Sequence, residues 1–96
     1  SLKVFRAEVV KPLRLYGVTS IKAPLGLTER VRHRWYENGK LIFASPFYNM
    51  VGGRAEGFRL WTSFSFNSIA PGTKLRLDLE TEGGQLIGRA GLKTGS

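Results

Sequence analysis

Short runs in which apolar and polar residues alternate, each ended by glycine or proline, restrict the fold of this chain more than any other feature of its sequence. Twelve glycines and four prolines interrupt the 96 residues, so no window of about a dozen residues keeps the apolar period of an amphipathic helix. Val31, His33 and Trp35, by contrast, alternate with Arg32 and Arg34. A period of two places alternate side chains on opposite faces of a strand. The sequence therefore predicts an all-β chain.

Several further segments carry the same alternation. Residues 74–80 alternate leucine with charged residues, which predicts a strand with one buried face. Two more strands are expected over residues 4–10 and 13–18, separated by Lys11-Pro12, where the proline suits a bend or a sheet edge. A strand over residues 58–66 would have an aromatic inner face formed by Phe58, Leu60, Thr62, Phe64 and Phe66.

Two glycine-containing dipeptides predict hairpin turns and hence the pairing of the strands beside them. Asn38-Gly39 and Gly83-Gly84 tolerate positive φ at both central positions of a type I′ turn. With Asn38-Gly39 as the loop, Trp35 would face Ile42 and Arg34 would face Phe43, and cross-strand partners share a face. The predicted core face carries Val31, His33, Trp35, Ile42 and Ala44. The predicted outer face carries Arg30, Arg32, Arg34, Tyr36, Leu41, Phe43, Ser45 and Phe47.

The second hairpin is predicted to have a leucine-rich inner face and a charged outer face. The inner face would carry Leu75, Leu77, Leu79, Leu86, Gly88, Ala90 and Leu92. Asp78 would meet Arg89 on the outer face in an exposed salt bridge, which contributes at most ~1 kcal/mol. The acidic side chains Asp78, Glu80 and Glu82 are interpreted as a solvated strand face.

The strand count and turn spacing favour a small antiparallel β-sandwich of immunoglobulin-like size, with about seven strands. The competing fold is a five-stranded closed barrel of the oligonucleotide-binding kind. Residues 1–96 would form a single domain. Because the chain begins with Ser1, we expect it to be a fragment of a larger protein, with any membrane anchor upstream.

The run from Val31 to Lys40, with its His-Arg-Trp-Tyr element, resembles a bacterial family of domains of unknown function, the one numbered twenty-nine fourteen. The Arg59-Leu60-Trp61-Thr62-Ser63 strand, the Pro71-Gly72 turn and the strand at residues 84–88 complete the shared pattern, over roughly residues 27–93. The resemblance implies a small β domain, often at the C-terminal end of proteins with membrane-spanning segments. It implies no reaction.

Residues for catalysis or metal binding are scarce. The chain has one histidine and no cysteine, whereas metal sites draw three or four ligands. His33 lies in mid-strand on the predicted core face and is interpreted as a packed, hydrogen-bonded residue. The glycine-rich segment at 52–57 lacks the Gly-Lys-Ser/Thr ending of a phosphate-binding loop. The chain is therefore expected not to be an enzyme, and no cofactor or metal is expected.

The basic residues are the most informative for function, since the net charge is +8. Arg30, Arg32 and Arg34 would share an outer face with Tyr36, either as a solvated basic face or as a shallow surface for an anionic partner. Arg59 and Trp61 could extend that surface, unless Trp61 is buried. The sequence thus predicts a periplasmic or other extracytoplasmic interaction module of a bacterial membrane-associated protein. It would recognise an acidic glycan, a lipid headgroup or an acidic protein; the alternative is a nucleic-acid-binding β domain.

Overall fold

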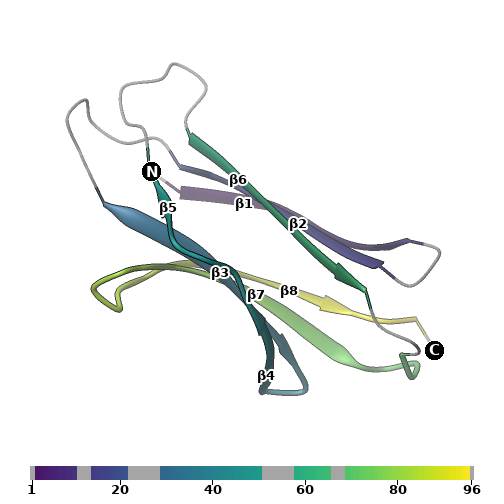
Figure 1. Cartoon of the computed structure of the whole chain (residues 1–96). Helices are drawn as coiled ribbons and strands as arrows, with labels where there is room; N and C mark the ends of the chain where they lie inside the picture. The colour runs from purple at the N-terminus through teal and green to yellow at the C-terminus, as the bar shows by residue number, and fades with distance from the viewer. Residues whose placement is uncertain (1, 11–13, 22–28, 51–57, 66–68, 96) are drawn as a thin grey trace.

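The computed structural model describes residues 2–10, 14–21, 29–50, 58–65 and 69–95. These residues form two antiparallel sheets that pack face to face (Figure 1). The smaller sheet has the order β1 (Leu2–Val10), β2 (Arg14–Ile21), β6 (Phe58–Ser65). The larger sheet has the order β4 (Lys40–Ala44), β3 (Arg30–Glu37), β7 (Lys74–Thr81), β8 (Leu86–Lys93), and β5 (Tyr48–Asn49) also pairs with β3.

The predicted all-β sandwich is confirmed, and the alternative of a closed barrel is wrong because the strands divide into two sheets. No helix occurs within the residues that the model describes. The bend at residues 11–13, the segment at 52–57 and Phe66 lie outside the described residues, so the predictions made for them stay predictions.

The core lies between the two sheets and has two apolar clusters. One contains Ile21, Val31, Met50, Leu60 and Leu79, and the other contains Leu15, Trp35, Leu75 and Leu77. Strands of both sheets contribute to each cluster, so burial of the clusters holds the sheets together. The predicted core positions of Val31, Trp35 and the leucines of β7 are confirmed.

Gly17 of β2 lies directly against the side chains of Trp35 and Leu77 in the larger sheet. A Cβ atom at this position would lie 2.8 Å from Cη2 of Trp35 and 2.8 Å from Cδ2 of Leu77. Real Cβ atoms do not approach other atoms so closely, so only glycine fits above the indole. The Trp35 ring is fully buried as a result.

The first hairpin turns at Asn38-Gly39 as predicted, with φ of 49° and 86°. Tyr36 pairs with Leu41, but a register shift follows, so that Trp35 pairs with Phe43 and Arg34 with Ala44. The predicted pairing beyond Tyr36 is therefore wrong by one residue. A bulge at Ile42 explains the difference, because one extra residue exchanges the faces of Phe43, Ala44 and Ser45, which directly follow it.

The bulge thereby reverses the predicted sides of three residues. Ser45, predicted on the outer face, is buried and its Oγ accepts a hydrogen bond from the His33 backbone N–H at 3.0 Å. Ala44, predicted in the core, is exposed. Phe43 packs against the second apolar cluster instead of facing Arg34.

The second hairpin also turns at the predicted place, with a different turn and one further bulge. Gly84 has φ of 91°, and the Gly84 N–H donates to the Thr81 carbonyl at 2.9 Å, so the connection is longer than a two-residue turn. Glu80 therefore pairs with Leu86, whereas Leu79 pairs with Gly88 as predicted. Leu86 is 47% exposed, so its predicted inward position is wrong, and the bulged Ile87 packs on the core in its place.

Candidate functional site

The outer face of the larger sheet carries the predicted arginines, and each of them has an acidic partner. We call Arg30, Arg32 and Arg34 the arginine row, and Asp78, Glu80 and Glu82 the acid column. Arg32 Nε donates to Glu80 Oε1 at 2.7 Å, and Arg30 Nη1 donates to Glu82 Oε2 at 2.8 Å. Arg34 Nη1 lies 3.5 Å from Glu80 Oε2. The interpretation of the acid column as a solvated face is wrong for Asp78 and Glu80, whose side chains are only 7% and 14% exposed, whereas Glu82 is 51% exposed. Glu80 and Glu82 supply the counter-charge of the arginine row.

Aromatic rings support the same arginines from the sides. The guanidinium carbon of Arg32 lies 4.5 Å from the centre of the Phe47 ring, and that of Arg30 lies 5.9 Å from it. The centre of the Tyr36 ring lies 4.0 Å from the guanidinium carbon of Arg76 and 5.5 Å from that of Arg34. Tyr36 lies beside the arginines on the outer face as predicted, whereas Phe43 turns to the core after the bulge at Ile42 and Phe47 is the second ring beside the arginine row. These cation–π contacts fix the guanidinium groups over the sheet.

Asp78 is more deeply placed than the sequence suggested. Arg89 donates to both of its oxygens, from Nε at 2.7 Å and from Nη2 at 3.0 Å, and Arg76 Nε lies 3.2 Å from Oδ1. The pairing of Asp78 with Arg89 is confirmed, but the carboxylate is 7% exposed, so the predicted exposed bridge is wrong on that side. The hydrogen bonds that Arg89 donates to Asp78, together with the negative charge of that carboxylate, raise the pKa of the Arg89 guanidinium.

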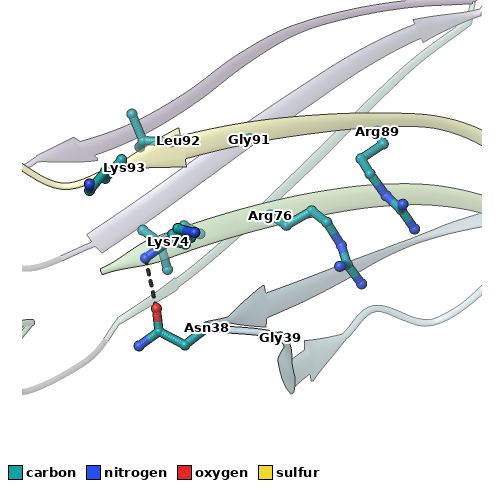
Figure 2. Close-up of a pocket in the computed structure, with 9 residues that line it drawn as sticks. Asn38, Gly39, Lys74, Arg76, Arg89, Gly91, Leu92 and Lys93 are labelled. Atoms are coloured by element: carbon teal, nitrogen blue, oxygen red, sulfur yellow. Dashed lines mark hydrogen bonds between the residues drawn. The ribbon is translucent and has the colours of Figure 1, made fainter. Parts of the chain in front are cut away.

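A hollow of about 550 Å³ lies on this face where β7 begins and β8 ends, beside the turn of the first hairpin (Figure 2). Its charged lining consists of Lys74, Arg76, Arg89 and Lys93, and no acid is present among the described residues that line it. Asn38 closes one side, where its Oδ1 accepts a hydrogen bond from the Lys74 N–H at 2.9 Å. We call this feature the basic hollow.

Arg59 and Trp61 belong to β6, in the smaller sheet, and lie on its outer face. Trp61 is 65% exposed, so the alternative that its side chain is buried is wrong. The outer faces of two packed sheets point in opposite directions. The prediction that Trp61 extends the surface of the arginine row is therefore wrong, since the structure does not bring these residues together.

The model of the family described as "Protein of unknown function (DUF2914)" matches residues 28–91, more than half of the chain. The chain belongs to the DUF2914 family. The resemblance noted in the sequence is thereby confirmed. No curated protein and no solved structure matches the chain. In the DUF2914 domain the matched residues run from just before β3 to Gly91 within β8, so they include the arginine row, the acid column and most of the basic hollow.

The basic hollow of the DUF2914 domain was missed at the level of sequence, although the signal for it was present. The predicted pairing of Asp78 with Arg89 already places Arg76 opposite Gly91 and Lys74 opposite Lys93, as the structure has them. Four basic side chains would then surround a residue without a side chain. The cluster forms across two strands, so the spacing of basic residues along either strand alone does not indicate it.

His33 of the DUF2914 domain is fully buried, which confirms its predicted structural role. Its Nε2 and the Thr19 hydroxyl lie 2.8 Å apart, and its Nδ1 is hydrogen-bonded to the Thr62 hydroxyl. Trp35 Nε1 donates to the same Thr62 oxygen at 3.0 Å. Burial lowers the pKa of His33 from 6.5 to about 4, because a charged imidazole loses its hydration in the core.

This pKa predicts that the domain loses stability in mild acid. Between pH 6.5 and about 4 the unfolded chain binds a proton at His33 and the folded chain does not. Stability is therefore complete above this range, falls as the pH falls through it, and the loss reaches about 3 kcal/mol at its lower end. Denaturant melts from pH 7 to 5 should show this slope, and a His33→Gln variant should lack it. Equal slopes in the two proteins would contradict the assignment.

Among the described residues, no group of three or more His, Asp or Glu side chains is placed to hold a metal ion. A search of the same residues for a helix long and apolar enough to cross a membrane finds none.

Proposed function

We propose that this DUF2914 domain is a non-enzymatic interaction module that binds an acidic glycan through the outer face of its larger sheet. The observation that carries the proposal is the excess of cations on this face. The cations are Arg30, Arg32, Arg34, Lys74, Arg76, Arg89 and Lys93, and the acid column is their counter-charge. A surface on which cations outnumber acids attracts polyanions over long range.

The state of the aromatic rings on this face supports a glycan over a nucleic acid. Proteins that bind single strands use exposed aromatic faces on which bases stack. Here Tyr36 and Phe47, the rings beside the arginine row, are half-buried and are covered by guanidinium groups. The face therefore offers charge and hydrogen-bond donors, which suits the carboxylates and sulfates of an acidic polysaccharide.

We also propose that the domain acts outside the cytoplasm, as part of a bacterial membrane-associated protein. The support is the family resemblance, which implies domains at the C-terminal end of proteins with membrane-spanning segments. A bacterial cell envelope is rich in anionic glycans, so a domain located there would meet the class of ligand that we propose for this face. The complete parent sequence tests this location directly, since it would contain a signal or a spanning segment.

Titration with heparin over a range of salt concentrations tests the proposal. We expect binding at low salt with log K falling linearly as log salt rises, because bound counterions are released. Replacing the arginine row with glutamine should weaken binding at low salt by about tenfold or more and flatten the slope. The effect should be large because the substitution also leaves Glu80 and Glu82 without partners.

The matched control removes as many charges from elsewhere on the surface. Arg14→Gln, Arg59→Gln and Lys40→Gln together change exposed side chains that lie outside the arginine row. We expect this variant to keep most of the affinity. Equal losses of heparin affinity in the two variants would mean that binding depends on the net charge alone and not on this face, which would contradict the proposal. No binding of the wild-type chain at low salt would also overturn it.

The second candidate function, binding of single-stranded nucleic acid, is favoured by the outer face of the smaller sheet. Trp61 and Tyr16 are 65% and 39% exposed on neighbouring strands of that face, beside Arg14 and Arg59. A single-stranded DNA arm of the same titration separates the two functions. Quenching of Trp61 fluorescence by DNA at a salt concentration that abolishes heparin binding would favour this candidate.

A further inference from the structure

Charge is unevenly distributed along β7. At its carboxyl end Glu80, and just beyond it Glu82, lie beside the arginine row and bond to it. At its amino end Lys74 and Arg76 lie beside β8, whose facing residues are Lys93 and Gly91. Of the whole outer face, this end has the greater excess of positive charge.

The cations around the basic hollow have little internal compensation. Asp78 is bonded to Arg89 and lies near Arg76, so one carboxylate is shared by two guanidinium groups. No acid of the described residues forms an ion pair with Lys74 or Lys93. Like charges held this close on a surface repel one another, so an anion bound between them relieves the repulsion.

Gly91 provides the space for such an anion. It lies on the outer face of β8 between Arg89 and Lys93 and opposite Arg76. A Cβ atom there would meet nothing closer than the Leu75 carbonyl oxygen at 3.9 Å, so the position is open to solvent. Figure 2 shows the side chains of Arg76 and Arg89 on one side of Gly91 and those of Lys74 and Lys93 on the other.

We propose that the basic hollow binds a phosphate or sulfate ester carried by a sugar residue of the glycan, an inference that rests on the function proposed above. The ammonium groups of Lys74 and Lys93, which no described acid pairs, can donate to such an oxyanion, and the guanidinium groups of Arg76 and Arg89 add positive charge beside them. A volume of about 550 Å³ exceeds that of a single oxyanion. The attached sugar therefore fits beside it, over Gly91 and the Asn38 turn.

The arginine row takes the lesser part in this recognition. Its guanidinium groups are already bonded to Glu80 and Glu82 and packed on aromatic rings. An anion approaching them must compete with these partners, whereas an anion approaching Lys74 or Lys93 does not. The strongest point of attachment therefore lies at the basic hollow.

Calorimetric titration with inorganic pyrophosphate tests the site. Gly91→Leu fills the hollow without changing the net charge, and we expect it to weaken pyrophosphate binding by about tenfold or more. Lys74→Gln with Lys93→Gln should weaken it to a similar extent. Gly83→Leu is the matched control, because a Cβ there has open space around it as well, its nearest neighbour being Thr81 Oγ1 at 3.8 Å. This control should bind as the wild-type chain does.

Two polymer arms identify the carrier of the anion. A sulfated heparin oligosaccharide should compete with pyrophosphate and lose affinity in Gly91→Leu, whereas phosphatidylglycerol vesicles should compete weakly. Stronger competition by the vesicles would assign the site to lipid headgroups and overturn the glycan. Thermal melts of all variants confirm that each is folded.

The results separate this inference from the proposed function. Unchanged pyrophosphate affinity in Gly91→Leu, with heparin binding by the wild-type chain intact, would overturn the site and leave the function standing. Loss of pyrophosphate affinity in Gly91→Leu, with no heparin binding by the wild-type chain, would uphold an oxyanion site and overturn the glycan-binding function.

Discussion

Replacing Trp35 with alanine is expected to lower the free energy of unfolding by about 3–5 kcal/mol, the range for truncation of a buried aromatic side chain. The indole is fully buried in the second apolar cluster, between Leu15 of the smaller sheet and the leucines of β7. The substitution also removes the hydrogen bond from Nε1 to Thr62. Chemical denaturation followed by circular dichroism measures the loss.

Trp61→Ala is the matched control for this substitution. It removes the same side chain from the outer face of β6, where 65% of the residue is exposed. The expected change in stability is about 0.5 kcal/mol or less, as for surface positions in general. Similar losses in the two variants would mean that the indole of Trp35 does not hold the sheets together.

Gly17→Val is expected to destabilise the domain by about 3 kcal/mol or more, at or beyond the upper end for added volume in a packed core. Its Cβ would lie 2.8 Å from Cδ2 of Leu77 and closer still to Cζ2 of the Trp35 ring. Neither side chain can withdraw, because both are fully buried. The two sheets must separate locally, and thermal melts should show a lower midpoint.

Two further variants test the reason for this loss. Gly91→Val adds the same side chain to a strand glycine on the outer face, where nothing lies closer than 3.9 Å, and should have little effect. Gly17→Val combined with Trp35→Leu should cost less than the sum of the single substitutions, because the smaller side chain opens space below the valine. Additive losses would locate the strain in the backbone of β2 instead.

Alternation along the chain was sufficient to predict the strands, the inner face of β3 and the leucines of β7. The turns at Asn38-Gly39 and Gly84 were equally visible, because positive φ restricts those positions to a few residue types. The bulges at Ile42 and Ile87 were not. A bulge adds one residue to a strand without changing its composition, so the alternation continues while the faces exchange.

The pairing of charges could not be predicted because it depends on contact between distant strands. Arg32 and Glu80 face each other across β3 and β7 and are far apart in the sequence. Considered strand by strand, the arginine row was a set of like charges that requires an anionic partner, and the acid column was a solvated face. Once β3 and β7 are neighbours, Glu80 and Glu82 neutralise part of the charge of the arginine row. The exposure of Trp61 was open for a similar reason, since β6 has large side chains on both faces.

The hydrogen-bonded group around His33 has a consequence for how the sheets align. Thr19 and Thr62 come from the smaller sheet and His33 from the larger, and the ring joins them between the two apolar clusters. Apolar contacts are not directional, so on their own they would allow one sheet to shift over the other with little change in buried area. A shift of two residues, ~6.7 Å along a strand, would move the imidazole out of hydrogen-bonding distance of both hydroxyl groups. The buried hydrogen bonds of His33 thus favour a single alignment of the two sheets.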